Sequence, residues 1–419
     1  MADGSDTPAH ATVLPPVEFA PPRSSVSLFT GIGGLDVGLE HAGFGVRWCV
    51  ELDPAARRAL ACLHPEWPLD PEGDVRKVDA LRWMASSGIR EGDLDLLAAG
   101  PPCQPFSHAS AWRQAPGRMH DARVEPFRVI FRTLAVQLRP RVILLENVPT
   151  LGNDAGQRWL RGWFRRLNRS AGTSYVPSFV VLNAVEHGVP QSRRRLFVVA
   201  ERDGRMFEAP SPSHYPSDAV PPGGQRYVTA WDAIGNLEDD SDPTLQCSGR
   251  WAGLLPSIPE GMNYYHHTPQ GAGVPLFGYR TRYWSFLLKL AKDRPTWTLP
   301  ASPGPATGPF HWKSRQLSAR ELAALQTIPL PQRLDLPLHV ARRLIGNAVP
   351  GVLGELMGYQ IRTQLFGEAL PWRPKLVPQL RDDCPAPTPA APVPSRFTVA
   401  WETPEAHPGA GRGPRPWQR

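Results

Sequence analysis

The feature that most constrains the fold of this chain is a series of short apolar runs separated by helical patterns. A helical stretch begins at Pro54, a residue that suits the first turn of a helix, and another with apolar residues on one face covers 125–138. Strands that are apolar without alternation belong to parallel sheets covered on both faces. The sequence therefore predicts a doubly wound α/β domain with a mostly parallel sheet. The expected strands are 25–29, 46–52, 94–100, 141–147, 178–185 and 195–201.

A change of composition divides the chain. From about residue 203 to 310, Pro, Gly, His and aromatic residues dominate and periodicity is weak, whereas helical patterns return at 318–326 and 352–366. Both ends are rich in proline, which excludes the interior of a regular helix or sheet. We expect four parts: a disordered tail (1–23), an α/β catalytic domain (24–202 plus 341–367), a smaller loop-rich domain (203–340) and a second disordered tail (368–419).

Composition limits the class of protein. The net charge of +7 suits a polyanionic partner, although many proteins are mildly basic and a GC-rich genome also enriches arginine. The five cysteines are scattered and form no C-x-x-C pair, which argues against a disulfide framework and a structural zinc site. We find no signal peptide and no apolar run of roughly 18–20 residues. We expect a cytoplasmic protein with no membrane contact.

A glycine-rich turn follows the first expected strand, in LFTGIGGLDVGLE (28–40). Gly31, Gly33 and Gly34 allow backbone to approach a ligand at the start of a helix. Such turns also occur in purely structural settings. Glu51, however, ends the second strand, where an acid commonly binds ribose hydroxyls, and Asp74 follows some 20 residues later. Together these features predict a nucleotide-like cofactor.

A candidate nucleophile lies in GPPCQPFS (100–107), where a third strand ends. Ligands of α/β folds bind at this edge of the sheet. Free cysteines are usually small buried apolar residues, and Cys49 and Cys62 fit that interpretation. Cys103 fits it poorly, because the prolines on both sides fix the sulfur at an exposed position.

Two further motifs place charged residues at strand ends. In LLENVPTL (144–151), Glu146 would lie beside apolar neighbours that raise its pKa, as a general acid requires, although a capping or ion-paired role is the alternative. In GVPQSRRRLFVV (188–199), Arg193 and Arg195 alternate and can point to one side of a strand. They suit a phosphate or a carbonyl oxygen, with a solvated basic edge as the alternative.

Taken in order, these blocks resemble those of the DNA cytosine-5 methyltransferase family. The resemblance covers about residues 25–200 and 311–352 and includes ARELAALQ and IGNAVP (345–350). It implies transfer of a methyl group from S-adenosylmethionine to C5 of a flipped-out cytosine in double-stranded DNA, by a reaction that needs no metal. It also implies the bacterial restriction–modification type, with a cognate restriction endonuclease encoded nearby. We expect a monomer.

The resemblance assigns roles position by position. Cys103 matches the thiolate that adds to cytosine C6, and Glu146 the residue that contacts N3 and the 4-amino group. Arg193 and Arg195 match the arginines of the Gln-x-Arg-x-Arg block, which help to hold the base and the active-site loop. Glu51 would bind the ribose hydroxyls and Asp74 the adenine amino group. The cofactor-binding positions are Phe29, Gly31, Gly33, Gly34, Glu51, Asp74, Pro102 and Asn347.

Departures from the family pattern and rival functions remain. The loop 107–123 is unusual in its middle, and ALQTIP has Thr327 and Ile328 where the family has Gly-Phe. A tRNA cytosine-5 methyltransferase would carry a Cys-Phe-Thr block, which we do not find. A catalytically inactive DNA-binding relative would have lost Cys103 or Glu146. A cysteine hydrolase needs a histidine base, and His108 is too close in sequence to serve.

The region 203–310 is the expected target-recognition part. Its arginines and aromatic residues suit contacts with base edges and phosphates, although the aromatic residues could equally form the core of this domain. We interpret His266 and His267 as a solvated loop pair rather than a metal site.

Overall fold

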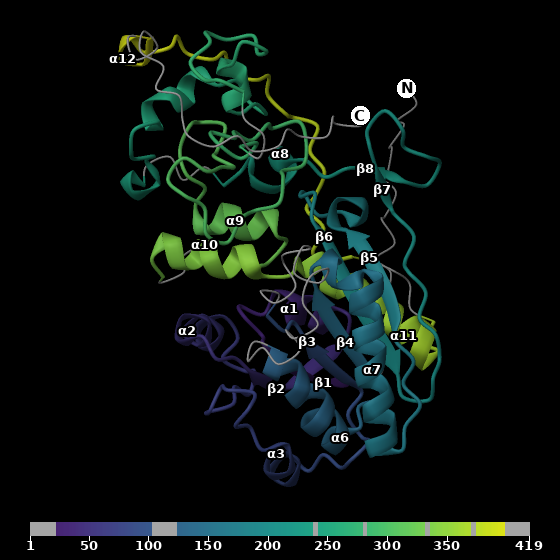
Figure 1. The fold of residues 1–419 in the computed structure, drawn as a ribbon. Helices are drawn as coiled ribbons and strands as arrows, with labels where there is room; N and C mark the ends of the chain where they lie inside the picture. The colour runs from purple at the N-terminus through teal and green to yellow at the C-terminus, as the bar shows by residue number, and fades with distance from the viewer. Residues whose placement is uncertain are drawn as a thin grey trace, which may run out of the picture.

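The structure is a computed structural model of the 419-residue chain, and it describes residues 22–102, 124–237, 242–279, 283–331, 336–369 and 374–398. Figure 1 shows a sheet flanked by helices, with a loop-rich part beside one of its ends. Cys103 and the loop 107–123 lie outside the described residues, as do Arg280 and Arg282 of the loop-rich part.

A six-stranded sheet forms the centre of the catalytic part, with strand order β2-β1-β3-β4-β6-β5. β1 pairs in parallel with β2 and β3, and β3 with β4, whereas β6 is antiparallel to both β4 and β5. The short connection from β5 to β6 explains this, because a parallel pair would need a long crossover. The predicted doubly wound, mostly parallel fold is confirmed. The strands are β1 (Arg23–Leu28), β2 (Phe44–Val50), β3 (Leu96–Ala99), β4 (Val142–Asn147), β5 (Ser178–Asn183) and β6 (Arg194–Glu201).

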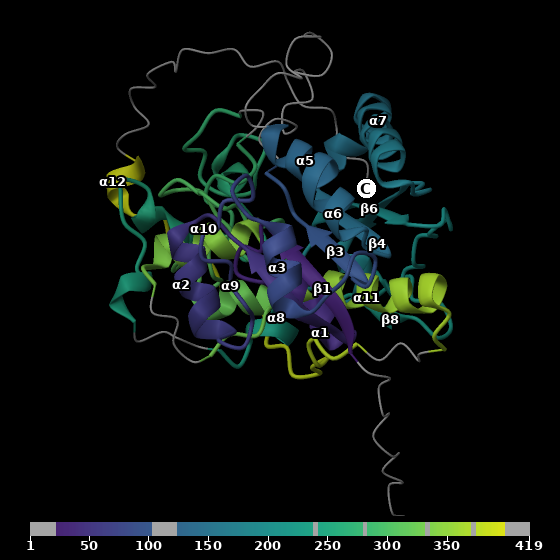
Figure 2. The same cartoon turned by 90° about the horizontal axis from the view of Figure 1, so that it is seen from below.

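Helices cover both faces of this sheet (Figures 1 and 2). One face packs against α3 (Ala80–Ser87), the continuous helix formed by α5 (Glu125–Val129), η3 (Ile130–Leu134) and α6 (Ala135–Leu138), and α7 (Asp154–Ala171). The predicted helix over 125–138 is therefore present, with a π-helical turn at its centre. The sequence reasoning missed α3 and α7. α1 (Gly34–His41) and α11 (Gly351–Phe366) cover the other face.

The contact between α1 and α11 requires glycine. A Cβ atom on Gly38 would lie 2.1 Å from the carbonyl oxygen of Gly351, and one on Gly354 would lie 2.3 Å from that of Leu35. The two backbones can therefore approach more closely than side chains would allow. This close packing fixes α1, whose first turn carries the predicted cofactor motif.

The loop-rich part contains little regular structure, as predicted. Its helix α9 packs against α8 and α10, and all three share an apolar cluster with α2 of the catalytic part. A second cluster contains Trp251, Tyr264 and Phe286, so these aromatic residues form a core. Tyr279, Tyr283 and Trp284 are instead exposed. The elements here are β7 (His214–Tyr215), β8 (Gln225–Arg226), α8 (Ala230–Ile234), η6 (Pro243–Leu245), η7 (Ala252–Ser257), η8 (Tyr264–His267), α9 (Ala319–Leu325) and α10 (Leu338–Asn347), with α2 at Pro54–Leu63.

Residues 374–398 form a C-terminal strap that contacts both parts. The backbone N–H of Lys375 donates to Glu355 on α11, that of Arg381 donates to Asp232 on α8, and that of Thr388 donates to Glu260. At its end, α12 (Ser395–Thr398) places Phe397 in the aromatic cluster of the loop-rich part. The segment is mostly irregular, as its prolines predict, but it is not the disordered tail expected from residue 368. Within the described residues no helix is long and apolar enough to cross a bilayer.

Candidate functional site

A cavity of about 800 Å³ opens where β1, β2, β3 and β4 end. This is the edge at which open α/β sheets bind their ligands, and the volume lies in the usual range for a small-molecule site. Segments from eight separate stretches of the chain meet here. Of the predicted site residues, Phe29, Gly31, Gly34, Glu51, Asp74, Pro102, Glu146, Arg195 and Asn347 line the cavity.

The turn after β1 is built around Glu51. The backbone N–H of Gly31 donates to Glu51 Oε2 and that of Asp53 donates to Oε1, each at 2.7 Å. Gly31 has a φ of +61° and Phe29 a φ of +59°, so the backbone turns sharply before α1. A Cβ atom on Gly31 would meet no atom within 4 Å. The turn thus presents bare backbone and a fixed carboxylate to the open cavity, which fits a nucleoside-containing cofactor.

Gly33 and Gly34 serve packing as well as the turn. Gly33 has a φ of +82°, and a Cβ atom there would lie 2.7 Å from the ring of Trp67. Gly33 is not among the lining residues. Gly34 lines the cavity, and its Cβ atom would lie 2.4 Å from the carbonyl oxygen of Val349.

Three aspartates line the cavity and differ in their hydrogen-bond and ion-pair partners. Asp74 forms an ion pair of 2.7 Å with Arg76, and this hydrogen-bonded partner lowers its pKa. Asp53 caps α2 and pairs with Arg343 at 2.6 Å, which lowers its pKa. Asp36 is 2% exposed, and burial raises its pKa to about 7. The sequence reasoning missed Asp36 and Arg343, both of which line the cavity.

Glu146 and Arg195 form the charged centre of the site. Arg195 Nε lies 2.9 Å from Glu146 Oε1, and the side chains are 15% and 12% exposed. Burial raises the pKa of Glu146, against the opposing influence of Arg195 and Arg193. The pairing of β4 with β6 places both residues at the same end of the sheet. This carboxyl group can therefore exchange a proton nearer to neutrality than an exposed glutamate can.

The proline loop before Cys103 is tied directly to this centre. The Asn147 Nδ2 amide donates to the carbonyl oxygen of Pro101 at 2.9 Å, and Asn147 Oδ1 accepts from the backbone of Val148. Asn147 is itself buried. The last described residue of the loop, Pro102, lines the cavity. Asn147, which sequence reasoning missed as a positioning residue, thus joins the Glu146 strand to the segment that carries Cys103.

Arg193 has a different place from the one predicted. Its side chain is 1% exposed, so it is not a solvated basic edge, and it does not line the cavity. Its guanidinium donates to the carbonyl oxygens of Gly346 at 2.8 Å and Ala348 at 3.0 Å. Gln191 beside it donates to Gln326 next to α9. Gln191 and Arg193 therefore link the sheet to α9 and to the end of α10, where Asn347 lies.

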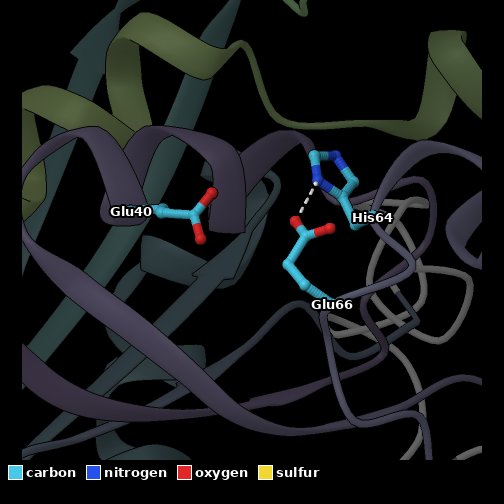
Figure 3. A group of neighbouring side chains, drawn as sticks. All are labelled: Glu40, His64 and Glu66. Carbon is cyan, nitrogen blue, oxygen red and sulfur yellow. Dashed lines mark hydrogen bonds and ion pairs between the residues drawn. The ribbon is translucent and has the colours of Figure 1, made fainter.

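One group of three potential metal ligands occurs among the described residues: Glu40, His64 and Glu66 (Figure 3). His64 Nδ1 lies 3.4 Å from Glu66 Oε1, and Trp67 Nε1 donates to Glu40 at 3.2 Å. These groups partner one another or the neighbouring indole, and none lines the cavity. We assign no metal to them.

The histidine pair of the loop-rich part is not a solvated pair throughout. His267 is 1% exposed, and both of its ring nitrogens are engaged, one with Ser257 Oγ and one with the carbonyl oxygen of Val274. His267 therefore stabilises the fold of this loop. His267 is buried, although we expected a solvated loop pair.

The arrangement defines a class of protein. A mostly parallel sheet with a glycine turn after β1, an acid after β2 and a cavity at the strand ends is typical of α/β proteins that bind a nucleoside-containing cofactor. The family model for C-5 cytosine-specific DNA methylases matches residues 24–363. The chain therefore belongs to this family. It is a DNA cytosine-5 methyltransferase that uses S-adenosylmethionine as its methyl donor, as the sequence motifs predicted.

Relatives of known class agree with this assignment. The chain is 32% identical over 366 residues to the Type II methyltransferase M.SacI of Streptomyces achromogenes, covering 81% of this chain and 93% of the relative. It is 31% identical over 354 residues to the Type II methyltransferase M.Eco47II of Escherichia coli, covering 80% and 78%.

Two solved structures share the fold. A DNA modification methyltransferase encoded within an E. coli prophage superposes with a TM-score of 0.57 at 20% identity, covering 82% of this chain and 99% of that one. A DNMT2 variant from Spodoptera frugiperda gives a TM-score of 0.55 at 16% identity, covering 81% and 99%.

Proposed function

We propose that this enzyme methylates C5 of a flipped-out cytosine within a specific DNA sequence, through a covalent bond between Cys103 and cytosine C6. The observation that carries the proposal is the hydrogen bond from Asn147 to Pro101, next to the Glu146–Arg195 pair. It fixes the proline loop that leads into Cys103 beside a buried carboxyl group at the mouth of one cavity. We propose that Cys103, which follows Pro102 in the sequence, supplies a thiolate beside this acid, a pairing that suits attack on a pyrimidine ring.

The proposed reaction begins at C6 of the cytosine ring and ends with release of Cys103. The Cys103 thiolate forms a bond to C6, and the electron pair of the C5–C6 double bond shifts so that C5 becomes nucleophilic. Glu146 contacts N3 and the 4-amino group and stabilises the charge that builds on the ring, while Arg195 holds its carboxyl group in place. C5 then forms a bond to the methyl carbon, and the sulfur–methyl bond of the donor would break to leave S-adenosylhomocysteine. A base removes the C5 proton, the double bond re-forms, and the thiolate leaves.

The cofactor supplies an electrophilic methyl group when it is bound. We assign the ribose hydroxyls to Glu51, whose carboxylate two backbone N–H groups already orient. We assign the adenine amino group to Asp74. Phe29, Gly31, Pro102 and Asn347, which line the same cavity, complete the proposed binding site, and Gly33 and Gly34 shape the turn.

We further propose that the catalytic part and the loop-rich part have different functions. Residues 24–202 plus 341–367 carry the chemistry, and residues 203–340 recognise the target sequence in double-stranded DNA. Exposed Tyr279, Tyr283 and Trp284 on the loop-rich part support this role, because aromatic residues stack on or wedge between bases. The Type II relatives support a restriction–modification role. We also propose a cognate endonuclease as partner and a monomeric enzyme in the cytoplasm.

The direct test is methyl transfer from labelled S-adenosylmethionine into random-sequence duplex DNA, followed by mapping of the modified base. We expect label on C5 of cytosine at one short sequence. The Cys103→Ser variant should incorporate none, and tRNA should not act as a substrate. Label on adenine, or equal activity of the Cys103→Ser variant, would overturn the mechanism. Transfer to tRNA alone would overturn the substrate.

A further inference from the structure

Helix α7 carries an unusual concentration of exposed positive charge on the outside of the catalytic part. Its 18 residues contain one acid, Asp154, in the first turn. Its five arginines, all exposed, are Arg158, Arg161, Arg165, Arg166 and Arg169. The reaction proposed above uses none of them.

The helical repeat gathers these side chains on one face. Residues 158, 161, 165 and 169 follow the spacing of 3 and 4 that aligns side chains along a helix. The opposite face is buried against the sheet, through Leu160, Phe164 and Leu167. The arginine face therefore points away from the core. At about 1.5 Å per residue it spans ~16 Å, which is the axial length of about five phosphates on one DNA strand.

Among the described residues, no acidic side chain neutralises this charge. None of the five arginines forms an ion pair with a described residue. Two guanidinium groups lie over aromatic rings, Arg166 over Trp163 at 5.1 Å and Arg161 over Phe179 at 4.9 Å. Between the side chains is a shallow depression of about 470 Å³ lined by Gly162, Arg165, Arg166, Asn168 and Arg169. Its guanidinium and amide groups are donors suited to phosphate oxygens.

The start of α7, which carries Arg158, lies on the substrate side of the sheet, whereas the chain just after its end lies at the opposite edge, where the backbone N–H of Ser174 donates to the carbonyl oxygen of Arg202. The helix follows β4 after the short η4 (Pro149–Gly152), so its first turn lies near the sheet edge that carries Glu146. Figure 2 shows α7 at the periphery of the catalytic part, on the side away from α1 and α2. A duplex seated over the cavity has to extend beyond it on both sides. We propose that the arginine face of α7 binds the phosphates of DNA flanking the methylated site, away from the cavity.

A duplex is the occupant that the charges favour. A row of arginines without interleaved acids matches a row of phosphates, whereas a protein partner would need apolar anchors, and this face offers none beyond the covered rings. The inference rests on DNA being the substrate, but it concerns flanking DNA only. It predicts a contribution to binding that depends on duplex length and on salt and not on base sequence.

The test uses a triple variant, Arg158→Gln, Arg165→Gln and Arg169→Gln, which spares the arginines braced on Trp163 and Phe179. The matched control, Arg47→Gln, Arg82→Gln and Arg90→Gln, removes the same charge from exposed arginines elsewhere on the catalytic part. A third variant replaces the same three α7 arginines by lysine. Affinity is measured across salt concentrations for arbitrary-sequence duplexes of about 40 and about 12 base pairs, the shorter spanning ~41 Å.

For the long duplex, we expect the glutamine variant to bind about tenfold or more weakly, with the slope of log affinity against log salt reduced by about 2 to 3. The lysine variant should keep the slope, and the control triple should match the wild type. On the short duplex all proteins should bind alike. Equal slopes for the glutamine variant and the control on the long duplex would overturn the inference. Failure of the wild type to methylate cytosine would instead overturn the proposed function.

Discussion

Asp36 offers a stability test with a magnitude set by the structure. The residue lies in the first turn of α1, is 2% exposed, and borders the cofactor cavity. Burial, with a smaller contribution from Glu40, raises its pKa from 3.8 to about 7, although a hydrogen bond with Ser27 opposes the shift. The folded protein therefore keeps this proton at pH values at which the unfolded chain has lost it.

The stability of the protein should fall with rising pH, because the two states bind different numbers of protons. Between pH 3.8 and about 7 the folded state binds one more proton than the unfolded state, so the free energy of unfolding falls as the pH rises through this window. At about 1.4 kcal/mol per pH unit, the loss reaches roughly 4 kcal/mol above pH 7, as an upper estimate for one buried group. The Asp36→Asn variant lacks this titration and retains an acceptor for Ser27.

The assay is urea unfolding of the wild type and the Asp36→Asn variant from pH 5 to pH 8. We expect the variant to be the more stable protein at pH 8, and its advantage to grow by about 2 kcal/mol between pH 5 and pH 7. Other titrating groups cancel in the difference between the two proteins. An advantage that does not change with pH would refute the reasoning, because Asp36 would then be ionised in the folded state throughout.

Three other changes test separate parts of the structure. Glu146→Gln should bind DNA nearly normally while kcat falls about 10²- to 10⁴-fold, since a group that exchanges protons is lost; weak binding with normal turnover would contradict its role. Gly38→Ala should destabilise the protein by about 3 kcal/mol or more in thermal unfolding, because the new Cβ meets the Gly351 carbonyl oxygen at 2.1 Å, and an unchanged Tm would count against the helix contact. Phe397→Ala should weaken the attachment of residues 374–398 to the loop-rich part by about 3 kcal/mol, since the Phe397 ring stacks on Trp251 at 5.9 Å. Limited proteolysis should then cut residues 374–398 much faster than in the wild type. Equal rates would show that the strap does not depend on Phe397.

The sequence predicted most of what local patterns determine. Apolar runs gave the strands, and Pro54 marked the first residue of α2. Predicted cofactor residues at strand ends converge on one cavity, because the carboxyl ends of parallel strands meet at one edge. Helix α7 was not predicted, because its arginines and Gly162 obscure the regular spacing of its apolar residues.

Features that depend on distant partners could not be predicted. β6 begins at Arg194, so Arg193 precedes the strand and reaches carbonyl oxygens more than 150 residues away. The proline-rich C-terminal strap looks disordered by composition, yet buried acceptors on Glu355, Asp232 and Glu260 receive its backbone N–H groups. No local pattern in either segment indicates its partner.

The proposal that Cys103 attacks cytosine can be tested by trapping the adduct. A duplex library in which 5-fluorocytosine replaces every cytosine is incubated with the enzyme and S-adenosylmethionine, because fluorine at C5 cannot leave as the proton does. We predict a denaturation-resistant complex of protein and DNA with the wild type and none with the Cys103→Ser variant. Absence of the complex with an active wild type, or its formation by the serine variant, would contradict the covalent mechanism.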